Sequence, residues 1–280
     1  MSEYEREFNF TDRDFGNIRR LVSEHTGISL SDAKKNMVYS RLSRRLRQIG
    51  LDNFNNYLDL LKDKKNEDEL VHFTNAITTN LTSFFREQHH FDYLSKTLLP
   101  KLTEINKQTG KIRIWSAGCS TGEEPYSIAM TIKETIPESA GWDIKILATD
   151  LDSNVLETAK AGVYSEERVS GIPSSKVKRW FLKGKNKHAG KILAHPSLRE
   201  MITFGQLNLM QQWPVKGPID IIFCRNVVIY FDKPTQEILF KRYADVLTSK
   251  GHLFLGHSET MFKVKNTFNL IGQTIYQKQN

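Results

Sequence analysis

The chain has 280 residues, of which 39% are hydrophobic and 26% are charged, and its formal net charge is +8. This composition is typical of a globular protein with a sizeable core, and no apolar run approaches the ~18 residues that a membrane-spanning helix requires. The charged first residues predict no signal peptide, and the spacing of Cys119 and Cys224 suggests neither a metal site nor a disulfide framework. We therefore expect a cytoplasmic protein.

Residues 11–80 carry the periodicity of short helices. Thr11 and Asp14 form a capping-box pattern at the start of the first helix, and Ser31 can cap a second helix that runs to about Gly50. Apolar residues at helical spacing predict a third helix near residues 54–61 and a fourth near residues 66–77. We expect these segments to form a small all-helical interaction domain.

The second helix has a strongly basic sequence. Residues 34–47 contain six basic side chains and no acidic one, and Arg41, Arg44, Arg45 and Arg47 fall mostly off the apolar stripe. A run of charge is usually a solvated helix face. Six bases without one acid nevertheless favour a surface for an acidic partner.

From residue 111 the pattern changes to alternating strands and helices. Apolar runs predict strands at 112–117, 144–149, 219–224 and 251–256, with helices at about 123–136, 153–161 and 234–248. This alternation is typical of a mostly parallel sheet. A β-branched and aromatic run at 268–277 predicts a short antiparallel addition at the sheet edge.

Residues 165–205 interrupt the alternation with several Gly, Pro, Ser and Lys residues. No helix longer than about Ser174–Leu182 is indicated, and Lys191–Ala194 and Met201–Phe204 are short strand candidates. We interpret this segment as a small β insertion on one edge of the α/β domain.

A nucleoside-type site is predicted where the first strand enters its helix. Gly118 and Gly122 bracket a turn of small residues, and Asp150 ends the second strand, where a carboxylate can take two ribose hydroxyls. Glu123 and Glu124 begin the helix and would repel a pyrophosphate, so the turn favours S-adenosylmethionine (SAM), which carries no phosphate, over a dinucleotide. The third strand, near 219–224, presents Arg225 and Asn226 at the same edge.

Several long motifs, in order, resemble the bacterial chemotaxis methyltransferases, the CheR family. They are Met37–Arg47 (MVYSRLSRRLR), Thr79–Phe91 (TNLTSFFREQHHF), Trp115–Ser127 (WSAGCSTGEEPYS), Asp220–Asp232 (DIIFCRNVVIYFD) and Leu255–Glu259 (LGHSE). The resemblance covers nearly the whole chain.

The resemblance implies a class I SAM-dependent methyltransferase, with a Rossmann-like, mostly parallel mixed sheet, an N-terminal helical domain and a small inserted antiparallel β subdomain. We expect a receptor-recognition domain at residues 1–80, the SAM-binding methyltransferase domain at 81–280 and the inserted subdomain at 165–205. The implied activity is transfer of the SAM methyl group to chemoreceptor glutamates, which forms methyl esters in sensory adaptation and leaves S-adenosylhomocysteine. The implied enzyme is a protein-glutamate O-methyltransferase that uses no metal.

The resemblance also assigns site residues. Arg86 and Tyr230 match the methyl-transfer pair, and motif alignment selects Glu124 rather than Glu123 for the cofactor. The positions that match cofactor contacts are Asn80, Thr82, Arg86, Glu124, Asp150, Asn208, Leu209, Arg225 and Asn226. For partners, it implies the helical bundle of a receptor at Arg41, Arg44, Arg45 and Arg47, and in some relatives a receptor C-terminal peptide at the β insertion.

The implied chemistry is consistent with the residues present. A glutamate has a reference pKa of about 4.3, so it is already ionised at neutral pH and needs no general base. Arg86 and Tyr230 would orient it. We expect no nucleic-acid partner and no membrane insertion. The protein would associate with membrane receptor arrays only through the receptor. The alternatives are a catalytically silent SAM-binding adaptor and a methyltransferase for another acidic protein or nucleic acid.

Other reactive side chains have simpler interpretations. His89 and His90 are adjacent, so on a helix we expect them not to address one metal ion but to be satisfied or exposed. Cys119 and Cys224 have no histidine nearby in sequence, and we expect both to be packing residues.

Overall fold

The computed structural model describes residues 6–261 and 267–279. The N-terminal part contains helices α1 (Asp12–Thr26), α2 (Lys35–Ile49), α3 (Phe54–Lys62) and α4 (Glu67–Ile77), packed around their own apolar core. The capping box of Thr11 and Asp14 is confirmed, and Gly50 ends α2 in the left-handed conformation. Ser31 precedes a short 3-10 turn, Asp32–Lys34, and its side chain makes no capping bond.

A helical segment follows the connector and precedes the first strand. It comprises α5 (Gln88–Tyr93), a π-helical turn, η3 (Leu94–Leu98), and α6 (Leu99–Ile105). Leu94, Leu98 and Leu99 are fully buried and join the core beneath the sheet. The sequence placed His89 and His90 on a helix, but it predicted no bounds for this segment.

Seven described strands form one sheet in the order β6-β2-β1-β7-β8-β10-β9. Strands β6 (Ile202–Gln206), β2 (Asp143–Asp150), β1 (Lys111–Ala117), β7 (Ile219–Cys224) and β8 (Leu247–Leu255) are parallel. The edge strands β10 (Ile275–Lys278) and β9 (Phe268–Gly272) add antiparallel pairing, as predicted. The chain leaves β1 toward β2 on one side and returns to β7 on the other, which creates a topological switch point.

Helices cover both faces of the sheet. Side chains of α6, α7 (Glu123–Thr135) and α8 (Ser153–Ala161) share one core with Ile112 and Ile114 of β1. Side chains of α11 (Lys233–Val246) share the other core with Trp115 and Ala117. Alternate residues of β1 therefore serve opposite faces, as in a buried parallel strand.

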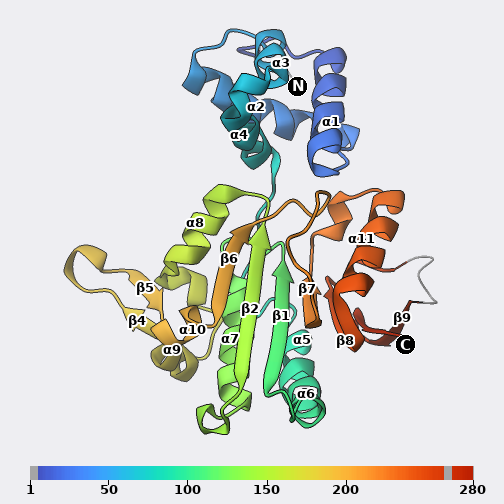
Figure 1. Ribbon diagram of the computed structural model, residues 1–280. Helices are drawn as coiled ribbons and strands as arrows, with labels where there is room; N and C mark the ends of the chain where they lie inside the picture. The colour runs from blue at the N-terminus through green and yellow to red at the C-terminus, as the bar shows by residue number, and fades with distance from the viewer. Residues whose placement is uncertain (1–5, 262–266, 280) are drawn as a thin grey trace.

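A separate antiparallel sheet, β3-β5-β4, projects from the edge near α8 (Figure 1). It contains β3 (Val163–Ser165), β4 (Phe181–Lys183) and β5 (Lys191–Ala194), with α9 (Ser174–Trp180) and α10 (Pro196–Arg199) beside it. The prediction that Met201–Phe204 lies in this insertion is wrong, because Ile202–Gln206 pairs in parallel with β2 in the main sheet. A short apolar run does not reveal which sheet it joins.

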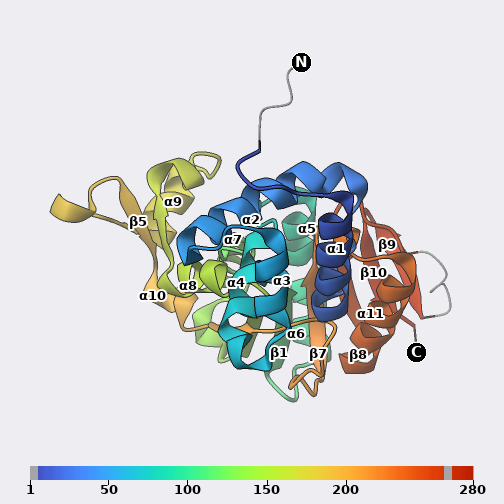
Figure 2. The same ribbon diagram turned by 90° about the horizontal axis from the view of Figure 1, so that it is seen from above.

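The four N-terminal helices sit over the carboxyl ends of the parallel strands (Figures 1 and 2). The backbone N–H of Ser29 donates to the carbonyl of Tyr230 at 2.7 Å, and Ile28 forms a β-bridge with Phe231. These contacts fix the helices against the sheet edge where ligands of open α/β proteins bind. Within the described residues, no helix is long and apolar enough to cross a membrane.

Candidate functional site

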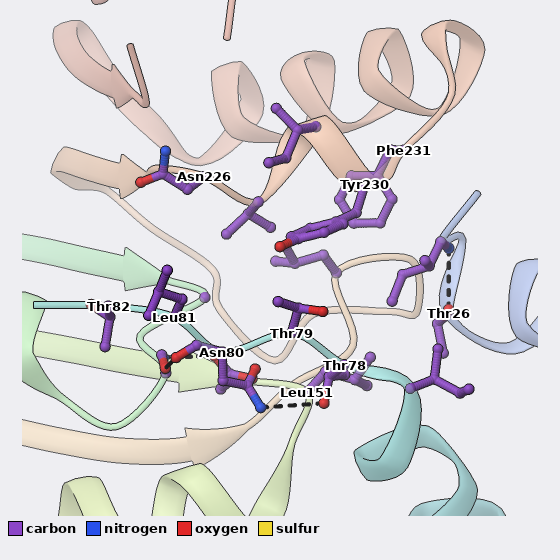
Figure 3. Close-up of a pocket in the computed structure, with 18 of the residues that line it drawn as sticks. Thr26, Thr78, Thr79, Asn80, Leu81, Thr82, Leu151, Asn226, Tyr230 and Phe231 are labelled. Atoms are coloured by element: carbon purple, nitrogen blue, oxygen red, sulfur yellow. Dashed lines mark hydrogen bonds between the residues drawn. The ribbon is translucent and has the colours of Figure 1, made fainter. Parts of the chain in front are cut away.

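A cavity of about 400 Å³ lies between the helical domain and the carboxyl ends of the strands. Figure 3 shows its wall formed by the connector from Thr78 to Thr82 and by Tyr230 on the opposite side. The structure brings all ten predicted cofactor and methyl-transfer positions to this cavity: Asn80, Thr82, Arg86, Glu124, Asp150, Asn208, Leu209, Arg225, Asn226 and Tyr230. Its size is within the range of small-molecule sites.

The floor of the cavity is the turn after β1 and the end of β2. The Asp150 carboxylate accepts the backbone N–H of Ser120 at 2.7 Å and that of Asp152 at 3.0 Å, so its orientation is fixed. Burial raises the pKa of Asp150, although these backbone N–H groups favour its ionised form. Gly118 has φ +89°, and a Cβ there would lie 2.3 Å from Val227, so this turn requires glycine.

The two glutamates at the start of α7 have different surroundings. Glu124 lines the cavity, where one oxygen accepts from Ser116 Oγ and the other from Arg225 Nε, both at 2.7 Å. Glu123 is fully buried away from the lining and lies 3.0 Å from Arg168. Each glutamate thus has an arginine partner, which reduces the net negative charge at the helix start.

The connector is held to the floor by polar side chains. Asn80 Nδ2 donates to Asp152 at 2.7 Å, and Ser120 Oγ donates to the Asn80 carbonyl at 2.7 Å. Leu81, which lies between the predicted cofactor contacts Asn80 and Thr82, is 79% exposed. Arg86 Nη1 donates to the Leu81 carbonyl at 3.0 Å. The connector therefore holds Arg86, which is half-buried and lines the cavity.

The far end of the cavity is closed by the loop after β6. Asn208 Nδ2 donates to the His25 carbonyl at 2.6 Å, and its oxygen accepts the backbone N–H of Met210 at 2.9 Å. Leu209 is buried beside it. Asn208 therefore links α1 to the sheet domain while it lines the cavity.

The loop that carries Tyr230 is organised by a residue that was not predicted as functional. The buried Glu259 carboxylate accepts backbone N–H groups from Gly256 at 2.6 Å, Asn226 at 2.8 Å and Ile229 at 3.2 Å. Burial raises the pKa of Glu259 against these hydrogen bonds. The motif Leu255–Glu259 already contained this residue. Figure 3 shows the Tyr230 hydroxyl pointing into the cavity.

Backbone strain gathers around the cavity. Phe85, Glu87, Ser120 and Asn226 all have positive φ, between 49° and 59°. Non-glycine residues rarely adopt this region, and such strain is concentrated at functional sites.

The histidine pair behaves differently from the expectation. Ligand atoms of Glu87, His89 and His90 lie within 4.8 Å of one another, so the geometric argument that adjacent histidines cannot address one ion is wrong here. Charge, however, disfavours a cation: Arg225 Nη1 lies 3.2 Å from His90 Nδ1 and 3.5 Å from a Glu87 oxygen. His90 is satisfied, whereas His89 Nε2 is buried without a hydrogen-bond partner among the described residues.

The basic face of α2 is partly used inside the helical domain. Arg41 donates to the carbonyls of Ile77 at 2.8 Å and Thr78 at 2.6 Å, at the end of α4. Arg45 makes a two-point ion pair with Glu69. Arg44 and Arg47 are exposed. Of the four arginines predicted to contact a partner, two therefore also hold the domain together.

Both cysteines are buried, and burial raises the pKa of each thiol. Cys224 accepts a hydrogen bond from the Tyr243 hydroxyl at 3.1 Å. These surroundings are those of packing residues.

Comparison with known proteins agrees with this architecture. Residues 80–277 match the family described as "CheR methyltransferase, SAM binding domain", and residues 13–78 match "CheR methyltransferase, all-alpha domain". The chain is 42% identical to a chemotaxis protein methyltransferase of Escherichia coli, over 95% of this chain and 91% of the relative. It is 44% identical to chemotaxis protein methyltransferase 2 of Pseudomonas aeruginosa, over 97% and 95%. The predicted class I methyltransferase fold with a helical domain and a small antiparallel sheet is confirmed.

Proposed function

Because the chain belongs to the CheR methyltransferase family, we propose that it methylates glutamate side chains of chemoreceptors, the methyl-accepting chemotaxis proteins. The donor is SAM, and the products are a glutamate methyl ester and S-adenosylhomocysteine. The observation that carries the proposal is the single cavity that gathers Asp150, Glu124, Arg225 and Tyr230 at the switch point of the sheet.

The residues of the cavity fit SAM by their chemistry. Asp150 is a fixed carboxylate at the end of β2, which suits a ribose diol. The Glu124 carboxylate suits an ammonium group, and Asn208 and Leu209 suit the polar edge and the face of an adenine. Asn80, Thr82 and Asn226 supply further polar contacts. When bound, SAM supplies an activated methyl group.

The protein orients the two reactants and excludes water from them. The acceptor glutamate is ionised above its reference pKa of about 4.3, so no side chain has to remove a proton. Arg86 steers the carboxylate, and the Tyr230 hydroxyl donates to one of its oxygens. Holding two reactants in line can contribute about 7–11 kcal/mol to lowering the barrier. Methyl transfer by this arrangement requires no metal.

The receptor would be contacted by surfaces outside the cavity. We assign residues 1–80 to receptor recognition, with the exposed Arg44 and Arg47 of α2 facing an acidic helical bundle. Arg41 and Arg45 support this face from within. Residues 81–280 form the catalytic domain, and the inserted β3-β5-β4 sheet offers an edge strand, β4, for a receptor C-terminal peptide. The protein would act in the cytoplasm, at membrane arrays only through the receptor.

One assay tests this function. The protein is incubated with methyl-labelled SAM and membranes that contain a chemoreceptor, and the receptor band is treated with mild base. We expect label that base releases as methanol, and a receptor whose methylated glutamates are replaced by alanine should take up none. Binding of SAM without any label would indicate the silent adaptor, and label in nucleic acid or in another protein would indicate a different substrate.

A further inference from the structure

Arg225 is the most enclosed charged side chain of the cavity, with 2% of its side chain exposed. Its Nε donates to Glu124 at 2.7 Å, and its Nη1 donates to the carbonyl of Arg86 at 2.5 Å. The guanidinium also lies over the rings of Phe91 and Phe223, at 5.3 and 5.8 Å. It therefore connects Glu124 on the floor to the segment that carries Arg86.

Arg225 Nη1 also faces His90 Nδ1, at 3.2 Å, and an oxygen of Glu87, at 3.5 Å. The His90 ring is fully buried. Arg225 has only donors, so Nδ1 accepts from it when the ring is neutral, although a Glu87 oxygen also lies 3.4 Å from Nδ1. The other nitrogen, Nε2, lies 3.0 Å from the carbonyl of Gln273 and must donate. In the neutral ring, Nδ1 is therefore the acceptor and Nε2 is the donor.

The protonation state of His90 is consistent with this assignment. Burial, and then the charge of Arg225, lower its pKa to about 4. The charged groups that face it are Arg225, Glu87 and His89, with Gln273 and Thr274 on the remaining side. At neutral pH the Nδ1 lone pair is therefore available to Arg225.

The anchor behind His90 is a rigid turn between β9 and β10. Thr274 Oγ1 lies 3.2 Å from His90 Nε2 and donates to the carbonyl of Leu255 at 2.9 Å. The backbone N–H of Leu255 donates in turn to the Thr274 carbonyl at 3.0 Å. The turn is thus fastened to the end of β8 and fixes the plane of the imidazole.

We propose that His90 is a positioning residue for the donor site, which holds Arg225 in the orientation that presents Glu124 and Arg86 to the cavity. His90 does not line the cavity and acts only through Arg225. The inference rests on the proposed SAM site and adds to it a residue that aligns it. The same Nδ1 lone pair cannot serve a metal ion while it accepts from Arg225.

The two functions of the ring, acceptor and anchor, can be separated by substitution. His90→Asn places an amide oxygen near the position of Nδ1 and keeps an acceptor for Arg225, but it is too short to reach Gln273. His90→Gln places an amide N–H near the position of Nε2 and keeps the anchor, but it loses the acceptor. His90→Phe loses both and keeps the ring volume.

The measurement is the dissociation constant of S-adenosylhomocysteine, by calorimetry, together with Tm for each variant. We expect His90→Asn to bind within about threefold of the wild type, and His90→Gln and His90→Phe to bind about tenfold or more weakly, the effect of one lost charged hydrogen bond. Tm should fall for all three. Equal affinities of the Asn and Gln variants, or affinities that follow Tm alone, would overturn the inference. A wild type that does not bind S-adenosylhomocysteine would instead contradict the proposed function.

Discussion

The two walls of the cavity differ in how firmly their side chains are held. On the sheet side, Asp150, Glu124 and Arg225 are each at least nine-tenths buried, and every one has fixed hydrogen-bond partners. On the other wall, the lining residues Leu81 and Ile229 are 79% and 50% exposed. A wall that is organised before binding suits a ligand of constant shape, and an open wall suits a side chain delivered by a large partner.

This contrast separates binding from chemistry. The firm wall should determine the affinity for the methyl donor, and loss of one partner of its buried Glu124–Arg225 pair should lower the stability. The open wall, with Arg86 and Tyr230, should affect turnover and the use of the receptor. Substitutions on the two walls are therefore expected to give different patterns of defects.

The largest effect is expected from Arg225→Met. The substitution leaves Glu124 and Glu87 buried without their cation, and loss of one partner of a buried ion pair costs about 3–5 kcal/mol. Urea unfolding should show this loss. The double variant with Glu124→Gln should recover part of it, and a loss below about 1 kcal/mol in the single variant would argue against a firmly paired wall.

Acidification should weaken the fold through buried histidines. Burial, and then the charge of Lys101, lower the pKa of His252 to about 4. Burial, and then the charge of Arg225, lower the pKa of His90 to about 4 as well. In the unfolded chain these groups titrate near 6.5, so unfolding takes up protons between pH 6.5 and about 4. Stability is therefore full above pH 6.5 and falls as the pH drops, by up to about 3 kcal/mol for each histidine.

The check is the free energy of unfolding at a series of pH values. In His252→Leu, the decrease between pH 7 and pH 4.5 should be smaller than in the wild type by up to about 3 kcal/mol. Identical pH profiles of the two proteins would show that His252 is not the titrating group. Neither ring nitrogen of His252 has a hydrogen-bond partner among the described residues, so its replacement breaks no bond described there.

A small effect is expected from substitution of an exposed arginine on α2. Arg44→Glu on α2 should raise the apparent KM for receptor by about two- to fivefold and weaken its dependence on salt, because exposed charges mainly steer association. Lys107→Glu, an exposed lysine at the opposite end of the sheet, is the matched control and should change neither. If Arg44→Glu instead weakened binding of S-adenosylhomocysteine, α2 would belong to the donor site.

Local signals in the sequence predicted most of the elements. The capping box of Thr11 and Asp14 lies within three residues, and apolar runs between turns predicted β1, β2 and β7 to within about one residue. The bounds of the helical segment from Gln88 to Ile105 were not predicted. This segment begins with polar residues and contains a π-helical turn, which shifts the spacing of the buried leucines.

The errors concern partners that are distant in sequence. Met201–Phe204 was assigned to the insertion because nothing in a four-residue run reveals its neighbour. Arg41 was interpreted only as a partner contact, and its bonds to carbonyls 36 and 37 residues away were not predicted. The positions around the cavity were found through long motifs, but the hydrogen bonds from His90 to Arg225 and from Glu259 to its loop depend on the folded backbone.

The separation of the two walls is tested most directly by one variant measured in two ways. Tyr230→Phe removes only a hydroxyl that points into the cavity (Figure 3). We predict that methyl transfer to receptor falls about tenfold or more, while the dissociation constant of S-adenosylhomocysteine stays within about twofold of the wild type. An unchanged turnover, or a loss of affinity as large as the loss of turnover, would contradict the account.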